Sequence, residues 1–569
     1  MNNLLPLIIV CCAIAIAVCC RQLTASLLKP FRCLMRRLSQ SVAQGVLFFF
    51  CLTLLCELLL GLCVRMPEPM VHDEFAYLLA ADTFASGRLT NPTHPRWEHF
   101  ESFHIIHQPT YQAKYPPAQG LLLAVGQVIT GYPIAGAWLG MAAASAAVFW
   151  MLCGWVPRRW AVYGGFLVSL NASFLTGWGL SYWGGQTALL GGALLFGAYP
   201  RLKARPQVTT SLILALGLVI LANSRPYEGL LAALPVACAL LFWLIGTSRP
   251  QLSIALSRII LPLALVLLPA FLWMGYYNFR VTGDALKFPY QAWIEQYWPH
   301  SLDNVLFADQ GHTDETKTIR SLYSYDINAA PDQPPILHQF DQSRFSLPVK
   351  LLKFDLVYTG SYMVGLICLC GIGALFRNRK NLFVLLTATL VIVGVLIQDT
   401  SGHPHYLAPI GCLLILMQVQ CLRYVFLWKR HWRSVGKMLV ATVLLLTALT
   451  TLASAAAGAL PAAVSEFHQW AVVRQQILEK LEDTEGKHLV LVNYRPDHSV
   501  HKEWVYNRAD IDQAKVVWAR VLEPDKNQQL LDYFKDRTVW IVEGDATIPE
   551  LTPYTNRQHS KEQKGQPAR

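Results

Sequence analysis

The sequence of 569 residues contains little charge. Asp, Glu, Lys and Arg make up 15% of it, whereas apolar residues make up 54%. Soluble domains average about 25% charged residues. This composition excludes a disordered regulator, a secreted disulfide scaffold and a soluble multidomain enzyme. Because the apolar residues fall into long runs, the sequence indicates a polytopic membrane protein.

Two kinds of motif are also missing. There is no P-loop and no Rossmann fingerprint, and the pair Gly371 and Gly373 is not followed by a third glycine at the required spacing. These absences argue against ATP-driven transport and against a nucleotide-sugar fold. All fourteen cysteines fall in apolar runs, at their edges or in a basic loop, so no disulfide framework is expected.

Twelve apolar runs are long enough to cross a bilayer as helices. We expect spans at 3–20, 44–64, 134–155, 160–176, 183–199, 207–223, 228–246, 257–279, 352–376, 382–398, 404–425 and 436–459. The first run has no basic residue before it and a basic loop after it, so we expect a retained anchor instead of a signal peptide. The shorter run 118–130 follows Tyr115-Pro116-Pro117, and we expect it to form an interfacial or re-entrant helix.

The net charge of +11 could indicate a nucleic-acid partner. The basic residues instead lie in short loops between apolar runs, which is typical of membrane orientation. Twenty basic residues and no acid lie in alternate loops, which we therefore expect to be cytoplasmic. They are Arg21, Lys29, Arg32, Arg36, Arg37, Arg158, Arg159, Arg201, Lys203, Arg205, Arg249, Arg258, Arg377, Arg379, Lys380, Arg423, Lys429, Arg430, Arg433 and Lys437. The large loops 65–133 and 280–351 and the chain after 459 are then expected outside.

The expected organisation has four parts. Residues 1–43 form an anchor helix and a basic loop, and residues 44–459 form the transmembrane domain. Residues 460–547 contain two helical patterns, at 469–482 and 527–536, and two buried strands, at 488–494 and 538–542. This pattern predicts a small extracytoplasmic α/β domain. The polar tail 548–569 is expected to be disordered.

Five polar clusters lie at the ends of spans that are expected to face outside. Ionisable residues at such positions suggest a binding or catalytic site. In the first cluster, Asp73 can accept a proton from an attacking hydroxyl, with Glu74 as its neighbour. The alternative is a solvated acidic pair that closes an interfacial helix.

The other clusters supply cations, imidazoles and amides. Arg225 can bind a phosphate with its planar guanidinium, or it can form a structural ion pair with Glu228. Lys114 and Arg280 can bind phosphate or extend to the membrane interface. Histidines can bind phosphate, sugar or metal. The remaining candidates for binding the substrate are Tyr115, Asn278, His403, His405 and Tyr406.

A histidine-rich stretch, 94–107, is a candidate site for a divalent metal. It contains His94, His99, His104, His107, Glu98 and Glu101, but it lacks a strict ligand spacing. The alternative is an amphipathic interfacial segment with Trp97, Phe100 and Phe103.

These features resemble the polytopic GT-C glycosyltransferases, including protein O-mannosyltransferases, aminoarabinose transferases and bacterial lipopolysaccharide sugar transferases. The resemblance covers about 44–425 and rests on a span followed by His72-Asp73-Glu74, then Lys114-Tyr115-Pro116-Pro117. The stretches Tyr277 to Asp284 and His405 to Pro409 are also similar. Where many relatives place a second acid, this chain has Tyr182 to Gly185.

The resemblance implies an all-α fold of about 12 transmembrane helices with the small α/β domain added. It also implies a sugar transferase, hexosyl or pentosyl, that uses a polyprenyl-phosphate donor in the bacterial cytoplasmic membrane, with a glycan, lipid or protein as acceptor. Asp73 would be the base, with Glu74 beside it, and Lys114, Arg225, His403 and His405 would lie near the lipid phosphate. The alternatives are a transporter or flippase, a glycan polymerase or ligase, and a scaffold that displays the tail domain.

Overall fold

The computed structural model describes residues 33–63, 66–297, 347–360, 362–398, 403–429, 435–458, 469–495 and 498–554. They divide into two compact units, each built from separate stretches of the chain. The helical unit takes its described residues from Met1–Pro67, Pro116–Tyr276 and Gln339–Ala463. The mixed unit, which contains helices and strands, takes them from Glu68–Tyr115, Tyr277–His338 and Val464–Arg569.

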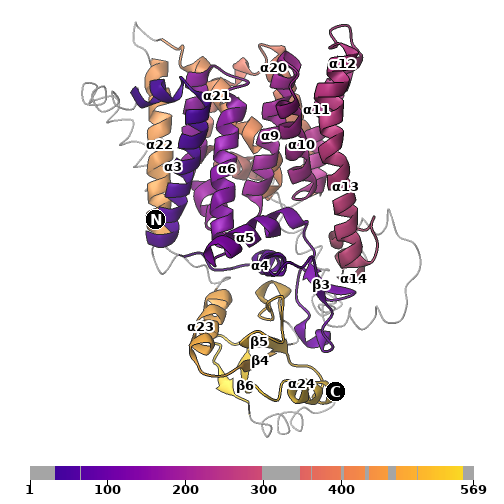
Figure 1. The fold of residues 1–569 in the computed structure, drawn as a ribbon. Helices are drawn as coiled ribbons and strands as arrows, with labels where there is room; N and C mark the ends of the chain where they lie inside the picture. The colour runs from indigo at the N-terminus through magenta and orange to yellow at the C-terminus, as the bar shows by residue number, and fades with distance from the viewer. Residues whose placement is uncertain are drawn as a thin grey trace. The chain divides into compact units, whose positions relative to one another are not determined.

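The helical unit is a bundle of mostly long helices (Figure 1). Seven helical stretches of the described chain are long and apolar enough to cross a membrane, as expected for a polytopic membrane protein. Its elements are α3 (Val42–Cys63), α5 (Pro117–Thr130), α6 (Ile134–Leu152), α7 (Arg158–Ser169), α8 (Ala172–Phe174), η2 (Leu175–Gly179), α9 (Gly185–Ala204), α10 (Val208–Ala222), α11 (Pro226–Ile245), α12 (Leu252–Ala255), η3 (Leu256–Ile260), α13 (Leu261–Thr282, ending in the mixed unit), α18 (Leu347–Thr359), α19 (Tyr362–Leu369), η4 (Ile372–Ala374), α20 (Arg379–Gln398), η5 (Pro404–Ile410), α21 (Gly411–Val425) and α22 (Val435–Gly458).

Two expected spans are not continuous helices. The span expected at 160–176 is interrupted at Asn171, whose side chain accepts a bond from the Phe174 N–H and donates to the carbonyls of Val357 and Tyr358. The span expected at 352–376 is interrupted at Gly360, where φ is +71°. A side-chain cap and a left-handed glycine both end helices locally. The span expected at 3–20 lies outside the described residues.

The short run at 118–130 does form a helix of less than membrane-spanning length. Helix α5 has 14 residues and lies across one end of α6 (Figure 1). A methyl group added to Gly126 would stand 2.1 Å from the backbone nitrogen of Gly136 on α6, so this crossing requires glycine. Its place at the membrane interface stays a prediction.

The mixed unit contains two small sheets and four helices of nine or more residues among its described residues. Its elements are α4 (His72–Ala85), β1 (Asn91–Pro92), η1 (Trp97–Phe100), β2 (Ile105–Ile106), β3 (Thr110–Ala113), α14 (Pro289–Tyr297), α23 (Gln469–Asp483), β4 (His488–Asn493), η8 (Val500–Lys502), β5 (Val516–Arg520), α24 (Pro524–Tyr533), β6 (Thr538–Glu543) and β7 (Thr552–Pro553), and the last turn of α13. The antiparallel sheet has the order β1-β3-β2, and the larger sheet has the order β5-β4-β6-β7.

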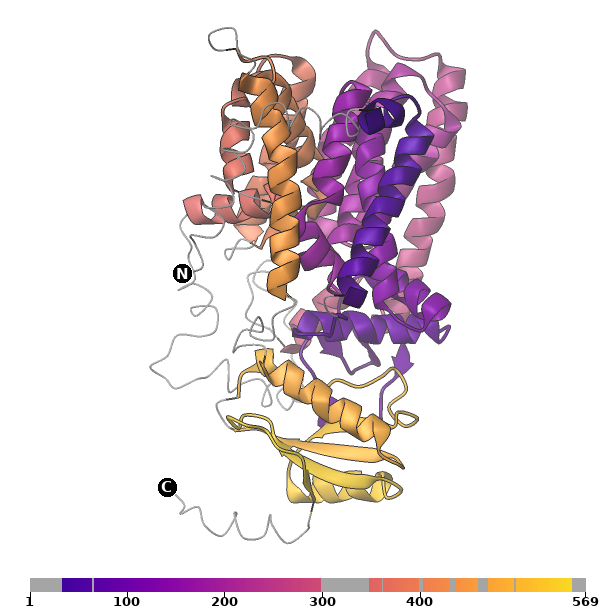
Figure 2. The same cartoon turned by 90° about the vertical axis from the view of Figure 1, so that its left-hand side faces the viewer.

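The predicted α/β tail is confirmed, with both expected helices and both expected strands present. Strand β4 pairs in parallel with β5 and β6. Helices α23 and α24 lie on opposite faces of this sheet (Figure 2). Both faces of β4 are therefore covered, which agrees with the burial of its first five residues.

The tail shares its hydrophobic core with the segment 68–115, which follows the first described span. Phe75 of α4 stacks on Tyr506, with ring centroids 4.4 Å apart, and the Arg474 guanidinium lies 4.8 Å from the Phe75 ring centroid. Arg474 also donates to the carbonyls of Trp504 and Tyr506. Helix α4 is thus fixed on the tail through its apolar face, which leaves its first turn to carry the polar residues.

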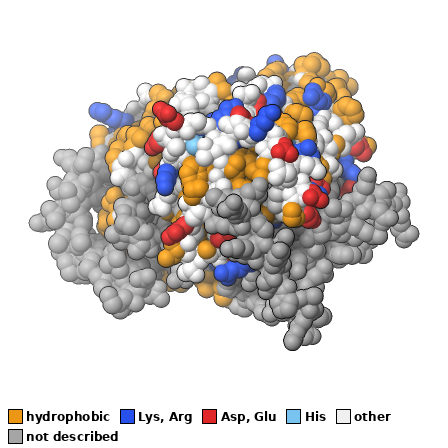
Figure 3. Space-filling view, turned by 90° about the horizontal axis from the view of Figure 1, so that it is seen from below, with side chains coloured by type: hydrophobic (Ala, Val, Ile, Leu, Met, Phe, Trp, Pro, Cys, Tyr) orange, Lys and Arg blue, Asp and Glu red, His pale blue; other side chains and the backbone are white. Residues whose placement is uncertain are grey.

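Figure 3 shows one face of the molecule, on which basic and acidic side chains are interspersed. On the described part of that face, the net positive charge does not gather into one basic patch.

Candidate functional site

The first turn of α4 carries both members of the predicted acidic pair, but in different environments. The Glu74 carboxylate accepts hydrogen bonds from the backbone N–H groups of Met70 and Val71, at 2.7 and 3.3 Å. These bonds close the entry to the helix. The structure therefore gives Glu74 a structural role, and its part in catalysis stays a prediction.

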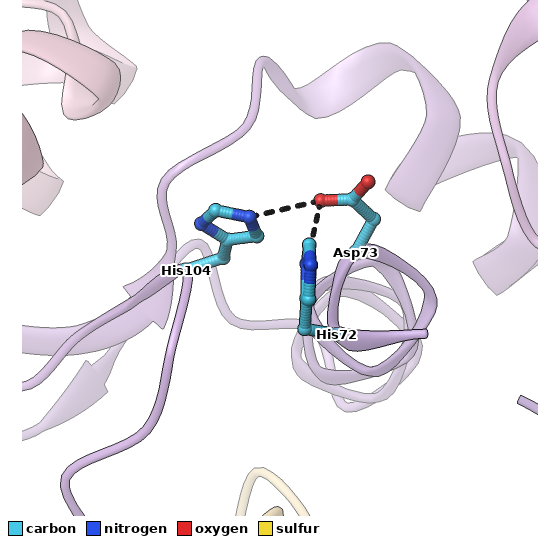
Figure 4. Close-up of side chains that lie close together, drawn as sticks. All are labelled: His72, Asp73 and His104. Atoms are coloured by element: carbon cyan, nitrogen blue, oxygen red, sulfur yellow. Dashed lines mark hydrogen bonds and ion pairs between the residues drawn. The ribbon is translucent and has the colours of Figure 1, made fainter. Parts of the chain in front are cut away.

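Asp73 is the centre of a compact polar cluster (Figure 4). Its Oδ1 atom lies 3.2 Å from His72 Nδ1 and 3.1 Å from His104 Nε2, and it accepts a hydrogen bond from the Tyr115 hydroxyl. The three contacts therefore share one carboxylate oxygen. The second oxygen, Oδ2, points away from both imidazole rings (Figure 4). We call His72, Asp73, His104, Lys114 and Tyr115 the Asp73 cluster.

The β2–β3 hairpin explains how distant residues meet in this cluster. Ile105 pairs with Ala113, and the next pair along the hairpin is joined by a bond of 3.1 Å from the Lys114 N–H to the His104 carbonyl. His104 therefore lies beside Lys114 and Tyr115. Its φ of +69° places it in the left-handed region, which costs a non-glycine residue about 1 kcal/mol or more.

The histidines control the charge of Asp73. Burial alone would raise the pKa of its carboxyl, but the His72 charge and hydrogen bonds from His104 and His72 outweigh burial and hold the pKa well below its usual range. Burial and the Lys114 and His72 charges lower the pKa of His104 well below its usual range. At neutral pH the cluster therefore holds an ionised carboxylate beside a neutral imidazole.

Lys114 is a buried cation in an aromatic environment. Its side chain is 4% exposed, and Nζ lies 3.6 Å from the centroid of Trp293 and 4.9 Å from that of Tyr290. Burial lowers the pKa of its ammonium to about 7, although the Asp73 charge opposes the shift. Cation–π contacts stabilise such a charge without neutralising it. Lys114 is therefore available to a negatively charged group.

The tail contributes one residue to the surroundings of Asp73. His501 Nδ1 lies 3.0 Å from His72 Nε2, and the two residues are 429 positions apart in the sequence. His501 therefore contacts the ring nitrogen of His72 that is not directed at Asp73, and this contact helps to fix the orientation of the His72 ring.

Most of the stretch predicted as a metal site instead attaches α4 and its loop to the tail. His94 lies 3.1 Å from Asp512, His99 contacts the carbonyls of Arg520 and Lys526, and Glu98 pairs with Lys526. Within the described ranges, one group of at least three possible metal ligands is found, namely His72, Asp73 and His104. Of the predicted stretch, only His104 belongs to it.

The helical unit holds a second polar cluster, made from three of the predicted motifs. The Arg225 guanidinium lies 4.8 Å from the Tyr406 ring centroid, and the His405 ring lies 4.5 Å from that of Tyr406. Trp183 and His403 complete it, with ring centroids 5.3 and 5.5 Å from that of His405. We call these five residues the Arg225 cluster. Its arginine and histidines suit an anion.

The remaining candidates are spread over two helices. Glu228 is buried in the first turn of α11, where a negative charge is favoured by the helix dipole. Asn278 is buried on α13 and donates to the Ala285 carbonyl at 3.3 Å. Arg280 is exposed near the end of α13. The structure therefore brings Lys114 and Tyr115 to Asp73, and His403, His405 and Tyr406 to Arg225.

Two relevant residues had not been selected from the sequence. His501 is an isolated histidine in the tail, and no spacing links it to His72. Glu57 is an acid inside the first described span, where it is 0% exposed and neither carboxylate oxygen has a hydrogen-bond partner among the described residues. A single acid within an apolar run is a detectable signal.

Comparisons with known proteins return distant similarities. No protein-family model matches the sequence, and no curated protein matches it. ArnT from Cupriavidus metallidurans in the apo state is similar over 88% of this chain and 93% of that one, with 12% identity and a TM-score of 0.48. The Archaeoglobus fulgidus oligosaccharyltransferase tethered with an acceptor peptide is similar over 88% and 69%, with 12% identity and a TM-score of 0.44. Both are GT-C glycosyltransferases. Because these TM-scores are below 0.5, the function proposed next rests on the residues of this chain alone.

Proposed function

We propose that this protein is a membrane glycosyltransferase that moves a sugar, hexosyl or pentosyl, from a polyprenyl-phosphate donor to a glycan, lipid or protein acceptor. The observation that carries the proposal is the Asp73 carboxylate, which is held by three donors on Oδ1 and lies in a cluster with the buried cation Lys114. A carboxylate of this kind can accept a proton while a neighbouring cation stabilises a leaving phosphate.

The proposed reaction is a single displacement with inversion. The acceptor hydroxyl attacks the anomeric carbon, the bond from that carbon to the phosphate oxygen breaks, and the polyprenyl phosphate leaves with the electron pair. Asp73 takes the hydroxyl proton on Oδ2. We place this reaction on the outer face of the bacterial cytoplasmic membrane, where nucleotide sugars are absent and an activated sugar must arrive on a lipid.

The test is a turnover assay of the full chain in nanodiscs with a panel of polyprenyl-phosphate sugars. We expect Asp73→Asn to lower release of polyprenyl phosphate by at least about 10²-fold, the usual contribution of a general base. Asp532→Asn is the matched control, because Asp532 is an exposed acid of the mixed unit that accepts a hydrogen bond from Gln528 in its own helix, α24. A fully active Asp73→Asn variant with native thermal stability would overturn the assignment.

One observation favours a transporter as the second candidate. Glu57 lies inside α3, and a methyl group added to Gly179 of η2 would stand 1.9 Å from its Oε1 atom. A buried acid within a span is typical of proton-coupled transport. Lipid-linked sugar movement that is lost in Glu57→Gln and retained in Asp73→Asn would support this alternative.

A further inference from the structure

The contacts of Asp73 share an unusual feature, because the ligand-type atoms converge on one point. His72 Nδ1 and His104 Nε2 both approach Oδ1, at 3.2 and 3.1 Å, and these three atoms all lie within 4.8 Å of one another (Figure 4). Zinc bonds of about 2.0–2.1 Å in a tetrahedral site separate the ligand atoms by about 3.3–3.4 Å. The two measured separations are within a few tenths of an ångström of that value.

Hydrogen bonding alone explains this convergence less well. A carboxylate has two oxygens and about four acceptor positions, so its donors usually spread over both oxygens. Here the Tyr115 hydroxyl also donates to Oδ1, so the side-chain interactions found for Asp73 among the described residues all go to that oxygen. The two imidazole nitrogens therefore approach the same oxygen, and the three atoms lie close enough together to be ligands of one cation.

We propose that His72, Asp73 and His104 form a site for a divalent transition metal of the zinc type. Two imidazole nitrogens and one carboxylate oxygen suit zinc, whereas magnesium and calcium prefer oxygen ligands throughout. Three protein ligands leave one position of a tetrahedral site open to water or a substrate oxygen, as in catalytic zinc sites. The role of the metal in transfer rests on the proposed function, but its binding does not.

The ligands are fixed in place by their neighbours. His501 Nδ1 contacts His72 Nε2 at 3.0 Å, which is the hydrogen bond to the far nitrogen that ordinarily orients a metal-binding histidine. His104 is held by the hairpin bond from Lys114 and by stacking on Phe103, with ring centroids 3.9 Å apart. The tail domain therefore supplies an orienting residue for the site, and His501 is expected to influence metal affinity without being a ligand.

The neighbouring cation Lys114 opposes metal binding electrostatically. Its Nζ is held over the Trp293 ring at 3.6 Å from the centroid, and no described hydrogen bond directs it to Asp73. The Trp293 ring therefore holds the ammonium through a cation–π contact. A metal on Oδ1 also leaves Oδ2 free to accept the proton of the acceptor hydroxyl.

The test is metal binding to the full chain in nanodiscs, purified without a polyhistidine tag and stripped with EDTA. We expect one Zn²⁺ per chain by calorimetry, with no competition from Mg²⁺, and tetrahedral d–d absorption bands when Co²⁺ replaces Zn²⁺. His104→Asn should lower the affinity by at least 10²-fold. Asparagine is chosen because it tolerates the left-handed backbone of this position. His501→Gln should lower the affinity by about 10–100-fold.

His94→Gln is the matched control, because His94 lies in the same loop but bonds Asp512. It should leave the affinity unchanged, and thermal unfolding should show that every variant is folded. Absence of stoichiometric Zn²⁺ binding by the wild type, or wild-type affinity in His104→Asn, would overturn the site. Turnover in EDTA together with no Zn²⁺ binding would contradict the metal site and support the transferase function. Zn²⁺ binding without turnover of any donor would support the metal site and contradict the transferase function.

Discussion

The Asp73 cluster and the Arg225 cluster are built from similar residue types but differ in organisation. In the Asp73 cluster, two histidines and a tyrosine are directed at one carboxylate through hydrogen bonds. In the Arg225 cluster, the described contacts are between an arginine and aromatic or imidazole rings. The first arrangement fixes a negative charge, and the second brings a guanidinium together with imidazole and aromatic rings. Similar residues therefore suit proton transfer or a cation in one unit and an anion in the other.

The largest effect that distinguishes the two clusters is expected when the cation of the Asp73 cluster is removed. Lys114→Met should lower turnover by about 10²–10³-fold, since one charge-stabilising donor contributes that much in other enzymes. Lys287→Met is the control, because Lys287 belongs to the same unit and pairs with Glu295 at the surface. Equal turnover of Lys114→Met and the wild type would show that Lys114 only fills an aromatic cage.

The next test asks whether the Arg225 cluster binds an anion. Arg225→Ala should weaken binding of polyprenyl phosphate in nanodiscs by about 10–100-fold, since charged hydrogen bonds contribute about 1.5–3 kcal/mol. Arg225→Lys should recover part of this loss, because lysine keeps the charge but not the planar fork. If Arg225→Ala binds the lipid like the wild type, Arg225 has only a structural role beside Tyr406.

The smallest effect concerns stability of the mixed unit. Burial raises the pKa of Glu101 to about 8, although Arg520 opposes the shift. The folded state therefore keeps a proton that the unfolded chain loses, and this contribution to stability falls as pH rises from about 4.5 to about 8.

Glu101→Gln should remove that dependence. At pH 8 the variant should be more stable than the wild type, and this difference should be smaller at pH 5. Thermal unfolding at pH 5 and pH 8 measures this, with Glu98→Gln as the control because Glu98 pairs with Lys526 at the surface. An equal pH dependence in Glu101→Gln and wild type would contradict the role of burial.

The sequence predicted most of the fold because its strongest signals are local. Long apolar runs mark α3, α6, α11 and α22, and short apolar strands mark β4 and β6. Strand β5 was not predicted, and Val516 to Arg520 is identified as a strand by its parallel pairing with β4. Asn171 interrupts a span through bonds to α18, which no local pattern reveals.

The site was predictable only in part for the same reason. Asp73, Lys114 and Tyr115 were selected from their motifs, and the hairpin then brings them together. The roles of Glu74 and His94 depend on partners that sequence spacing does not show, namely the backbone of Met70 and the side chain of Asp512. The expectation of one site for all five polar clusters stays a prediction.

The contact between His72 and His501 also has a consequence for biosynthesis. The ribosome must add 429 residues after His72 before His501 exists. At about 5–20 residues per second, this takes about 20–90 s. During that interval α4 and the loop at 94–107 lack the tail residues that they contact in the complete fold. The contact between His72 and His501 therefore forms only after residue 501 has been made, so a chain that is terminated before that residue lacks the orienting contact to His72.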